Sequence, residues 1–344
     1  MKKTALSALA LSGALMLALT ACGTTQPTAS ADGGKPAESA SADCAADSTA
    51  TSTGPVTLTD AFDRTVELDK PAERVAVLEW QQIEDALTLC VTPVAVADAS
   101  GYSTWVSAEE LPKDVVDVGT RQEPNLDALF AAEPDLVIVE AYTRDDAIIA
   151  QLEEYGVPVL ATLGADAADP IAQMLSTFDL IAQATGREER AAAVTEEFEA
   201  HLAEAKAEIT GLDVEVDSFV FFDGWVDGSN VSLRPFGQGS LVGEVGEELG
   251  LTNAWTGEVD AAYGLGQTDI EGMTAVGDAS LFYTGTEEED GSSFMDAVET
   301  NPVWKSLPAV QDDRLQAFPA GLWTFGGPRS TELIIDAYLE VLAK

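Results

Sequence analysis

Arg121 is the residue whose type and position most clearly suggest chemistry. It stands in the stretch DVGTRQEPNL, in a loop between an expected strand and a helix expected to begin at Asn125. A guanidinium can donate two aligned hydrogen bonds to anionic oxygens, so a loop arginine is a candidate for ligand binding. The alternative is that Arg121 neutralises a nearby carboxylate, and Asp117 and Glu123 are both close in the sequence.

Residues typical of catalysis give weaker signals. The single histidine, His201, lies in the amphipathic stretch EEFEAHLAEAK, where an exposed helical histidine is the simpler interpretation. The stretch GQGSLVGEVG (237–246) has neither the spacing of a nucleophile elbow nor that of a phosphate-binding loop, and Ser240 is better placed to cap a helix. No zinc-type cysteine spacing or catalytic carboxylate pair stands out, so the residues give little support for an enzyme.

The first residues predict export and a lipid anchor. MKKTALSALALSGALMLALTAC contains two lysines, an apolar run and small residues before Cys22. This is the pattern of a signal peptide over residues 1–21, and the cysteine after Leu-x-Ala resembles a bacterial lipobox. We therefore expect lipid attachment at Cys22 on the outer face of the cell membrane, with the lipid as the only membrane contact. An ordinary signal peptide with an incidental cysteine is the alternative.

Residues 22–55 are expected to form a flexible linker, because their Gly, Ser, Thr, Ala, Pro and Asp offer little to bury. Cys44 lies in this linker, and Cys90 ends the expected helix IEDALTLC. A disulfide between them is plausible in an oxidising compartment, but spacing alone leaves two unpaired thiols equally open.

Charge limits the possible partners. The chain has 60 acidic and 17 basic residues, for a formal net charge of −43. Nucleic-acid binding needs a basic face and is excluded, and adhesion to anionic lipid headgroups is disfavoured. The simplest role for the acidic residues is a well-solvated surface.

Hydrophobic patterning predicts an α/β fold with two lobes. Short apolar runs alternate with helical segments from RVAVLEW (74–80) to PVLATLG (158–164), which indicates βαβ units and a mainly parallel sheet. Helical periodicity then continues to about residue 209, with Gly186 as a cap or kink, before strands return. We expect an N-terminal lobe over 56–168, a linking helical segment over 169–210 and a C-terminal lobe over 211–344. A single larger sheet is the competing interpretation.

Five stretches carry a resemblance to a known family: VTLTDAFDRTVELDKPAERVAVLEWQQIEDALTLCVTPVAVAD, YSTWVSAEELPKDVVDVGTRQEPNLDALFAAEPDLVIVEA, GLTNAWTGEVDAAYGLGQTDIEGM, NPVWKSLPAVQDDRLQAFP and GLWTFGGPRSTELIIDAYLEVL. The resemblance is to the iron–siderophore-binding lipoproteins of ABC importers. It covers essentially the whole chain after the linker and implies two Rossmann-like lobes joined by a long helix, the class III architecture of these binding proteins. The hydroxamate-binding branch is the most similar.

The resemblance also implies a binding site between the lobes. The matching motifs assign Trp105, Arg121 and Tyr142 to the N-terminal side of the cleft. They assign Tyr263, Trp323 and Phe325 to the C-terminal side. Tyr263 stands where tryptophan is frequent in that branch and Phe325 where tyrosine is familiar, and these two departures bear on which ligand is bound. Cys90 also departs from a usual glycine.

A ferric hydroxamate is the expected ligand. Its oxygens would accept hydrogen bonds from Arg121, and aromatic faces would cover its apolar linkers. The iron would arrive as Fe(III) already chelated, so we expect no cofactor and no metal held by protein side chains. Ferric citrate is the alternative and would need several basic groups, for which Arg144, Arg234 and Arg329 are candidates; cobalamin and haem come after it.

The resemblance further implies docking to the membrane subunits of an ABC permease through one acid on each lobe. Glu271 of TDIEGM matches the C-terminal acid, and Asp146 is a weaker choice for the N-terminal one; both could equally be ordinary solvated carboxylates. A monomer is expected. A two-lobed enzyme or a purely structural lipoprotein would be distinguished from a binder by ligand turnover or by absence of ligand binding.

Overall fold

The structure is a computed structural model that describes residues 42–212, 216–228, 230–284 and 294–343. The expected signal peptide and the lipid-attachment site Cys22 lie outside these residues. The described residues belong to one compact unit that begins at Ala37.

The N-terminal lobe is built on a five-stranded parallel sheet. In spatial order its strands are β5 (Val116–Asp117), β4 (Ala95–Val96), β3 (Val75–Val77), β6 (Leu136–Glu140) and β7 (Val159–Thr162). The chain runs from β3 outward to β5 and then returns to β6 on the other side of β3. Strand order therefore reverses between β3 and β6, and such a reversal opens a crevice at the carboxyl ends of the strands.

Short helices connect these strands and cover the sheet. They are α2 (Trp80–Thr88), α3 (Ala99–Trp105), α4 (Leu126–Ala131) and α5 (Ala147–Glu153). An antiparallel hairpin, β1 (Val56–Thr59) and β2 (Thr65–Leu68), precedes the sheet and was not predicted from the sequence. The apolar run 74–80 ends as a strand at Val77, because Glu79 caps α2 by accepting a hydrogen bond from the Trp80 backbone N–H.

The C-terminal lobe has a second sheet with one antiparallel strand. Its parallel strands are β10 (Thr252–Asn253), β8 (Ser218–Asp227), β11 (Ser280–Tyr283) and β12 (Leu315–Ala317), and β9 (Asn230–Phe236) pairs antiparallel with β8. Its helices are α8 (Leu241–Glu248), α9 (Phe294–Val298), α10 (Pro308–Gln311) and α11 (Pro328–Leu342), with short 3-10 turns η1 (Gly272–Val276) and η2 (Trp304–Ser306). Ser240 caps α8, as its sequence position suggested.

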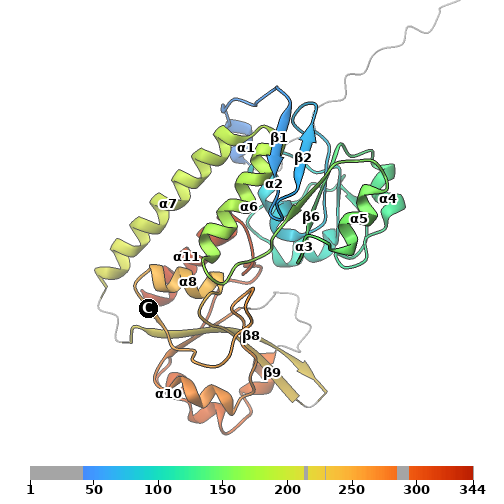
Figure 1. Ribbon diagram of the computed structural model, residues 1–344. Coiled ribbons are helices and arrows are strands. Elements are labelled where there is room, and N and C mark those ends of the chain that lie inside the picture. The colour runs from blue at the N-terminus through green and yellow to red at the C-terminus, as the bar shows by residue number, and fades with distance from the viewer. Residues whose placement is uncertain (1–41, 213–215, 229, 285–293, 344) are drawn as a thin grey trace, which may run out of the picture. The chain divides into compact units, whose positions relative to one another are not determined.

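Two helices join the lobes. Helix α6 (Pro170–Thr185) ends at Gly186, whose φ of 70° is the left-handed conformation that glycine adopts without steric cost, and α7 (Glu188–Thr210) follows. Ala191 and Val194 of α7 pack in an apolar cluster of the N-terminal lobe, whereas Phe198 and Ile209 pack in a cluster of the C-terminal lobe. Figure 1 shows α7 running beside α6 from the region of α1 (Ala42–Ala46) toward the C-terminal lobe. The predicted architecture of two α/β lobes with mainly parallel sheets and a helical connection is confirmed.

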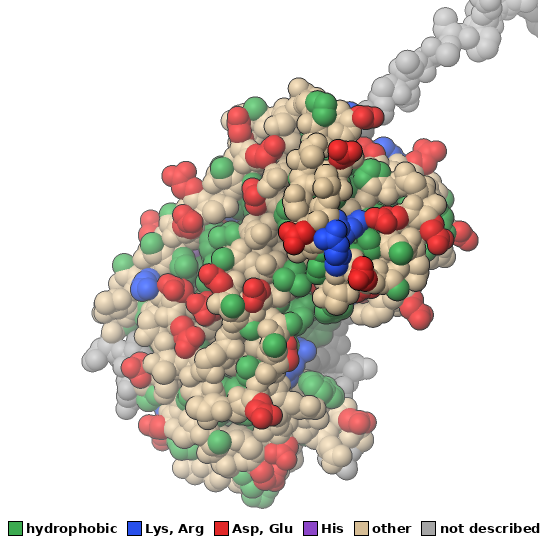
Figure 2. Space-filling view, viewed as in Figure 1, with side chains coloured by type: hydrophobic (Ala, Val, Ile, Leu, Met, Phe, Trp, Pro, Cys, Tyr) green, Lys and Arg blue, Asp and Glu red, His purple; other side chains and the backbone are tan. Residues whose placement is uncertain are grey.

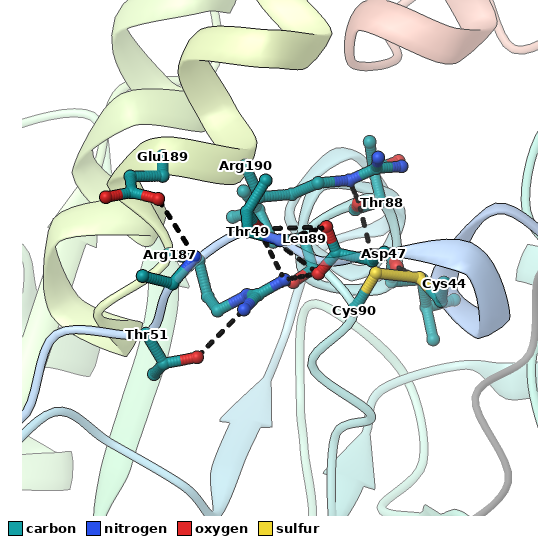
Figure 3. A network of polar contacts seen from close by, with 12 residues as sticks. Cys44, Asp47, Thr49, Thr51, Thr88, Leu89, Cys90, Arg187, Glu189 and Arg190 are labelled. Atoms are coloured by element: carbon teal, nitrogen blue, oxygen red, sulfur yellow. Dashed lines mark hydrogen bonds and ion pairs between the residues drawn. A yellow bond between two sulfur atoms is a disulfide. The ribbon is translucent and has the colours of Figure 1, made fainter.

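Residues 42–55, the described part of the predicted flexible linker, are held against the body of the protein. Figure 3 shows the contacts: Cys44 is disulfide-bonded to Cys90, and the Arg187 guanidinium pairs with Asp47 and donates to the Thr51 hydroxyl. The disulfide restricts the conformations open to this segment, which is poor in apolar residues, and hydrogen bonds of the buried Arg187 hold the segment in place. Composition alone could not reveal either contact.

Cys90 occupies the position that ends α2 in a left-handed conformation, with φ of 64°. The Val91 N–H donates to the Ala86 carbonyl and the Cys90 N–H to the Leu87 carbonyl, a pattern that normally uses glycine. This geometry explains why the resemblance implied glycine here. A cysteine costs about 1–2 kcal/mol more in that conformation, and the disulfide to Cys44 provides the compensating interaction.

Candidate functional site

A cavity of about 580 Å³ opens at the carboxyl ends of the strands in both lobes. Ligand pockets for compounds of drug size have volumes in this range. The cavity is lined by Glu79, Trp80, Gln81, Trp105, Arg121, Gln122, Glu140, Tyr142, Gly164, Asp223, Gly224, Arg234, Tyr263, Leu265, Thr284, Phe294, Leu322, Trp323, Thr324 and Phe325. All six residues predicted to line the cleft are among them, and their role in binding a ligand stays a prediction.

The N-terminal wall follows from the topology of the parallel sheet. Glu79 and Trp80 come directly after β3, and Glu140 and Tyr142 come at the end of β6, the neighbouring strand. Arg121 lies in the turn after β5, which a bridge between Gly119 and Pro124 closes. The strand reversal between β3 and β6 therefore brings these side chains to one edge of the sheet.

Arg121 is fixed by a carboxylate and an aromatic ring. Its guanidinium forms an ion pair with Glu79, and its Cζ atom lies 3.8 Å from the centroid of the Trp80 ring. Neither Asp117 nor Glu123, the two partners suggested by the sequence, forms this pair. The Nε atom of Arg121 is buried and has no hydrogen-bond partner among the described residues. The unpaired Nε donor costs free energy, whereas the side chain as a whole is 23% exposed, so a ligand in the cavity can reach other parts of the guanidinium.

Aromatic rings form a continuous wall across both lobes. Trp80 contacts Trp323 edge to face at 4.8 Å between ring centroids. Trp323 contacts Phe325 at 5.1 Å, and Phe325 contacts Tyr263 at 5.5 Å, again with the rings inclined. Edge-to-face packing restricts the rings and leaves other faces free for apolar parts of a ligand.

Two more aromatic residues of the cavity lining are at least partly exposed. Tyr142 is 69% exposed, and Trp105 at the end of α3 is half-buried. Side chains of this kind can contact a ligand that protrudes from the cavity.

A second ion pair lies on the C-terminal wall. Asp223 of β8 and Arg234 of β9 stand directly opposite each other in the hairpin, with 2.9 Å between Arg234 Nε and Asp223 Oδ1. Arg234 was considered from the sequence only for a citrate ligand, and Asp223 was not considered. The hairpin itself was missed, although an Asp-Gly dipeptide at 227–228 between two apolar runs is a recognised hairpin signal.

Glu140 is the third acid of the cavity and was also missed by sequence reasoning. Its Oε1 accepts a hydrogen bond of 2.9 Å from the Tyr263 hydroxyl of the opposite lobe. Burial raises the pKa of Glu140 to about 7, as does the nearby Glu79 carboxylate, whereas hydrogen bonds from Tyr263 and Tyr142 and the charge of Arg121 act in the opposite direction. The pKa of Tyr263 is raised by burial first and then by the same carboxylate.

The other predicted residues lie away from the cavity. Arg144 donates to the carbonyls of Phe62 and Asp63, and Arg329 pairs with Glu197 and Glu332. The ferric-citrate alternative therefore retains Arg234 alone of its three candidates.

The two predicted docking acids also differ in their surroundings. Asp146 caps α5 by accepting from the Ile148 backbone N–H, while Glu271 is exposed just before η1. His201 lies on α7 and contacts Asp336, 2.9 Å away, outside the cavity lining.

Neither a metal site nor a membrane-spanning helix is found in the part of the chain that the structure describes. No group of three or more His, Cys, Asp or Glu side chains there could hold a metal ion. None of its helices is long and apolar enough to cross a bilayer.

Comparisons with known proteins agree on a family. Residues 75–320 match the model of the periplasmic binding protein family. The iron(3+)-hydroxamate-binding protein FhuD of Escherichia coli K12 is 28% identical over 75% of this chain and 82% of its own length. The Fe(3+)-citrate-binding protein YfmC of Bacillus subtilis 168 is 29% identical over 76% of this chain and 78% of its own.

A solved structure supports the same grouping. The siderophore-binding protein FhuD of Vibrio cholerae, crystallised with Fe³⁺-Desferal, has a TM-score of 0.68 and 27% identity, covering 78% of this chain and 97% of that one. These similar proteins are binding proteins, so the prediction that the chain is not an enzyme is confirmed.

Proposed function

The chain belongs to the periplasmic binding protein family, and from this premise we propose that it captures a ferric siderophore in its cleft and delivers it to an ABC importer. A trihydroxamate is the favoured ligand. The similarity to the E. coli hydroxamate-binding protein and to the V. cholerae protein with Fe³⁺-Desferal supports this choice.

The position of Arg121 carries the proposal. Its guanidinium lies over Trp80 in the cavity lining, and its side chain is 23% exposed, so a ligand can reach it. The oxygens around a chelated Fe³⁺ carry partial negative charge and would accept hydrogen bonds from this group. The rings of Trp105, Tyr142 and Trp323 would cover the linkers between the hydroxamates. Iron is cargo here, since its coordination is complete before it meets the protein.

Charge in the cavity disfavours the ferric-citrate alternative. A ferric carboxylate is strongly anionic and would need converging unpaired basic groups. Arg121 and Arg234 line the cavity, but each already has a carboxylate partner. The similarity to the B. subtilis citrate-binding protein keeps ferric citrate as the second candidate. Haem and cobalamin rank lower; for haem, the single histidine of the chain, His201, lies outside the cavity lining.

We place the protein on the outer face of the cell membrane, held by a lipid at Cys22 as a monomer. Its permease contacts would include Glu271, which is exposed. Asp146 is a less suitable second contact because its carboxylate already caps a helix.

Tryptophan fluorescence tests the function directly, since three tryptophans line the cavity. Purified protein is titrated in parallel with ferric Desferal, ferric citrate and cobalamin. We expect ferric Desferal to quench the fluorescence with a submicromolar dissociation constant. Arg121→Ala should weaken the affinity about 10- to 100-fold, because charge-assisted hydrogen bonds are lost. Arg121→Lys should keep only part of the affinity, because lysine lacks the planar guanidinium group.

Arg144→Ala is the matched control, since it removes one positive charge outside the cavity. Its affinity for ferric Desferal should equal that of the unsubstituted protein. Quenching by ferric citrate alone would identify ferric citrate, not a ferric hydroxamate, as the ligand. If none of the three compounds quenched the fluorescence, the proposal would be refuted.

A further inference from the structure

The charges that line the cavity do not balance. Arg121 is paired with Glu79 and Arg234 with Asp223, so these four groups neutralise one another in two pairs. Glu140 remains as a third acid of the lining. Within the described residues, no lysine or arginine forms an ion pair with it. When Glu140 is ionised, the cavity therefore has a net negative charge.

Glu140 is placed where a ligand can reach it. It ends β6 in the N-terminal lobe, is only half-buried, and shares the cavity with the aromatic wall. Hydroxyl groups of Tyr263 and Tyr142 are its hydrogen-bond partners. A carboxylate has about four lone-pair sites, so it can accept further donors beside these two.

A partly buried carboxylate without a cation is costly, and a ligand cation would relieve that cost. An ammonium group is the suitable partner because it supplies three donors and one positive charge. Resting on the function proposed above, we propose that Glu140 forms a subsite for a protonated amine of the ferric hydroxamate, so that the cavity prefers cationic ferric complexes to neutral or anionic ones.

The subsite should depend on pH. Glu140 has a pKa of about 7 in the free protein, and the groups that influence it are Glu79, Arg121, Tyr142 and Tyr263. A bound ammonium favours the ionised carboxylate, so binding of a cationic complex should release a proton at pH 6. Its affinity should therefore rise between pH 6 and pH 8, while the affinity for a neutral complex changes little.

One pair of probes isolates the charge. Ferric Desferal is a linear trihydroxamate complex with a terminal amine, and its N-acetylated derivative has the same iron centre without the positive charge. At pH 8 the purified protein should bind the amine form about tenfold more tightly, the effect of one charge-assisted hydrogen bond. Glu140→Gln should reduce that ratio to about one. Glu67→Gln removes an exposed acid of β2 outside the cavity and should leave the ratio unchanged.

The comparison of the two probes on the unsubstituted protein does not depend on any variant. Equal affinities there would overturn the subsite while leaving the proposed function intact. A preference that persists in Glu140→Gln would assign the discrimination to another group and would also overturn it. If neither probe binds, the proposed function fails and the subsite with it.

Discussion

At the scale of single residues, buried carboxylates set the response of the protein to pH. Glu109 is 5% exposed, and its pKa is raised to about 7 by burial and, less strongly, by the nearby Glu84. The folded state therefore holds this proton at a pH where the unfolded chain has lost it. The contribution of this proton to the free energy of unfolding is complete below about pH 4.5 and is lost as the pH rises through about 7.

Glu109→Gln should therefore flatten the decline in stability between pH 5 and pH 8. At pH 8 we expect its melting temperature to exceed that of the unsubstituted protein by about 2–4 °C. Glutamine is neutral in both states, whereas Glu109 must take up a proton or bury its charge when the chain folds at this pH. Glu110→Gln, a change at the exposed neighbour, provides the control. If the melting temperatures of all three proteins changed with pH in the same way, Glu109 would not be the group responsible for the decline.

Sequence reasoning found the residues of the cavity whose type is unusual in this chain. Arg121 stands out among 60 acidic residues, and Trp105, Tyr142, Tyr263, Trp323 and Phe325 follow from motifs of a known family. Glu79 and Glu140 gave no such signal, because one more acid in an acidic chain is unremarkable. What distinguishes them is their position at the ends of β3 and β6, which pair only in the folded sheet.

At the scale of elements, α2 and α11 are locked together by buried polar contacts. The Glu84 carboxylate of α2 accepts hydrogen bonds of 2.8 Å from the Ser330 backbone N–H and 2.6 Å from its hydroxyl, at the start of α11. Neither Glu84 nor Ser330 is exposed by more than 1%. The glycine at 327 is required by this packing, since a Cβ atom there would lie 2.1 Å from Asp85 Oδ1.

Ser330→Ala should lower the free energy of unfolding by about 1–3 kcal/mol, because it removes a donor from a buried carboxylate that has no access to water. Chemical denaturation measures the change. Ser176→Ala on the exposed face of α6 is the control, and it should change the stability by less than about 0.5 kcal/mol. A similar small effect at Ser330 would mean that Glu84 does not depend on the hydroxyl.

Element prediction succeeded where an apolar run marks the strand and failed where pairing alone defines it. β3 to β8, β11 and β12 lie in runs that were predicted to be strands, although β4 and β5 have only two residues each. β10 has two residues, and the pairs β1–β2 and β8–β9 are hairpins whose exposed residues weaken the apolar signal. The contact of α2 with α11 joins residues 246 positions apart, a separation at which no local pattern acts.

At the scale of the whole molecule, acidic side chains are distributed over the surface. Figure 2 shows them across the visible face of both lobes, with few basic side chains among them. A net charge of −43 repels itself and disfavours compaction. Any movement that brings the lobes together must therefore overcome this repulsion as well as the stiffness of their connection.

That connection is stiff. α7 contributes Val194 to an apolar cluster of one lobe and Phe198 to a cluster of the other, so bending between the lobes would break continuous helix hydrogen bonds. The buried Glu84–Ser330 contact adds a second fixed point between the lobes. Hinge motion needs a few residues that can absorb large changes in backbone angles, and an uninterrupted helix offers none.

We therefore expect the lobes to close very little on the ligand. Small-angle scattering of the purified protein should give superimposable curves, and the same radius of gyration, with and without saturating ferric Desferal. Ser330→Ala, which loosens one of the two fixed points, is the informative comparison. Compaction only in that variant would identify the α2–α11 contact as the constraint. Marked compaction of the unsubstituted protein would show instead that α7 and this contact together do not hold the lobes apart.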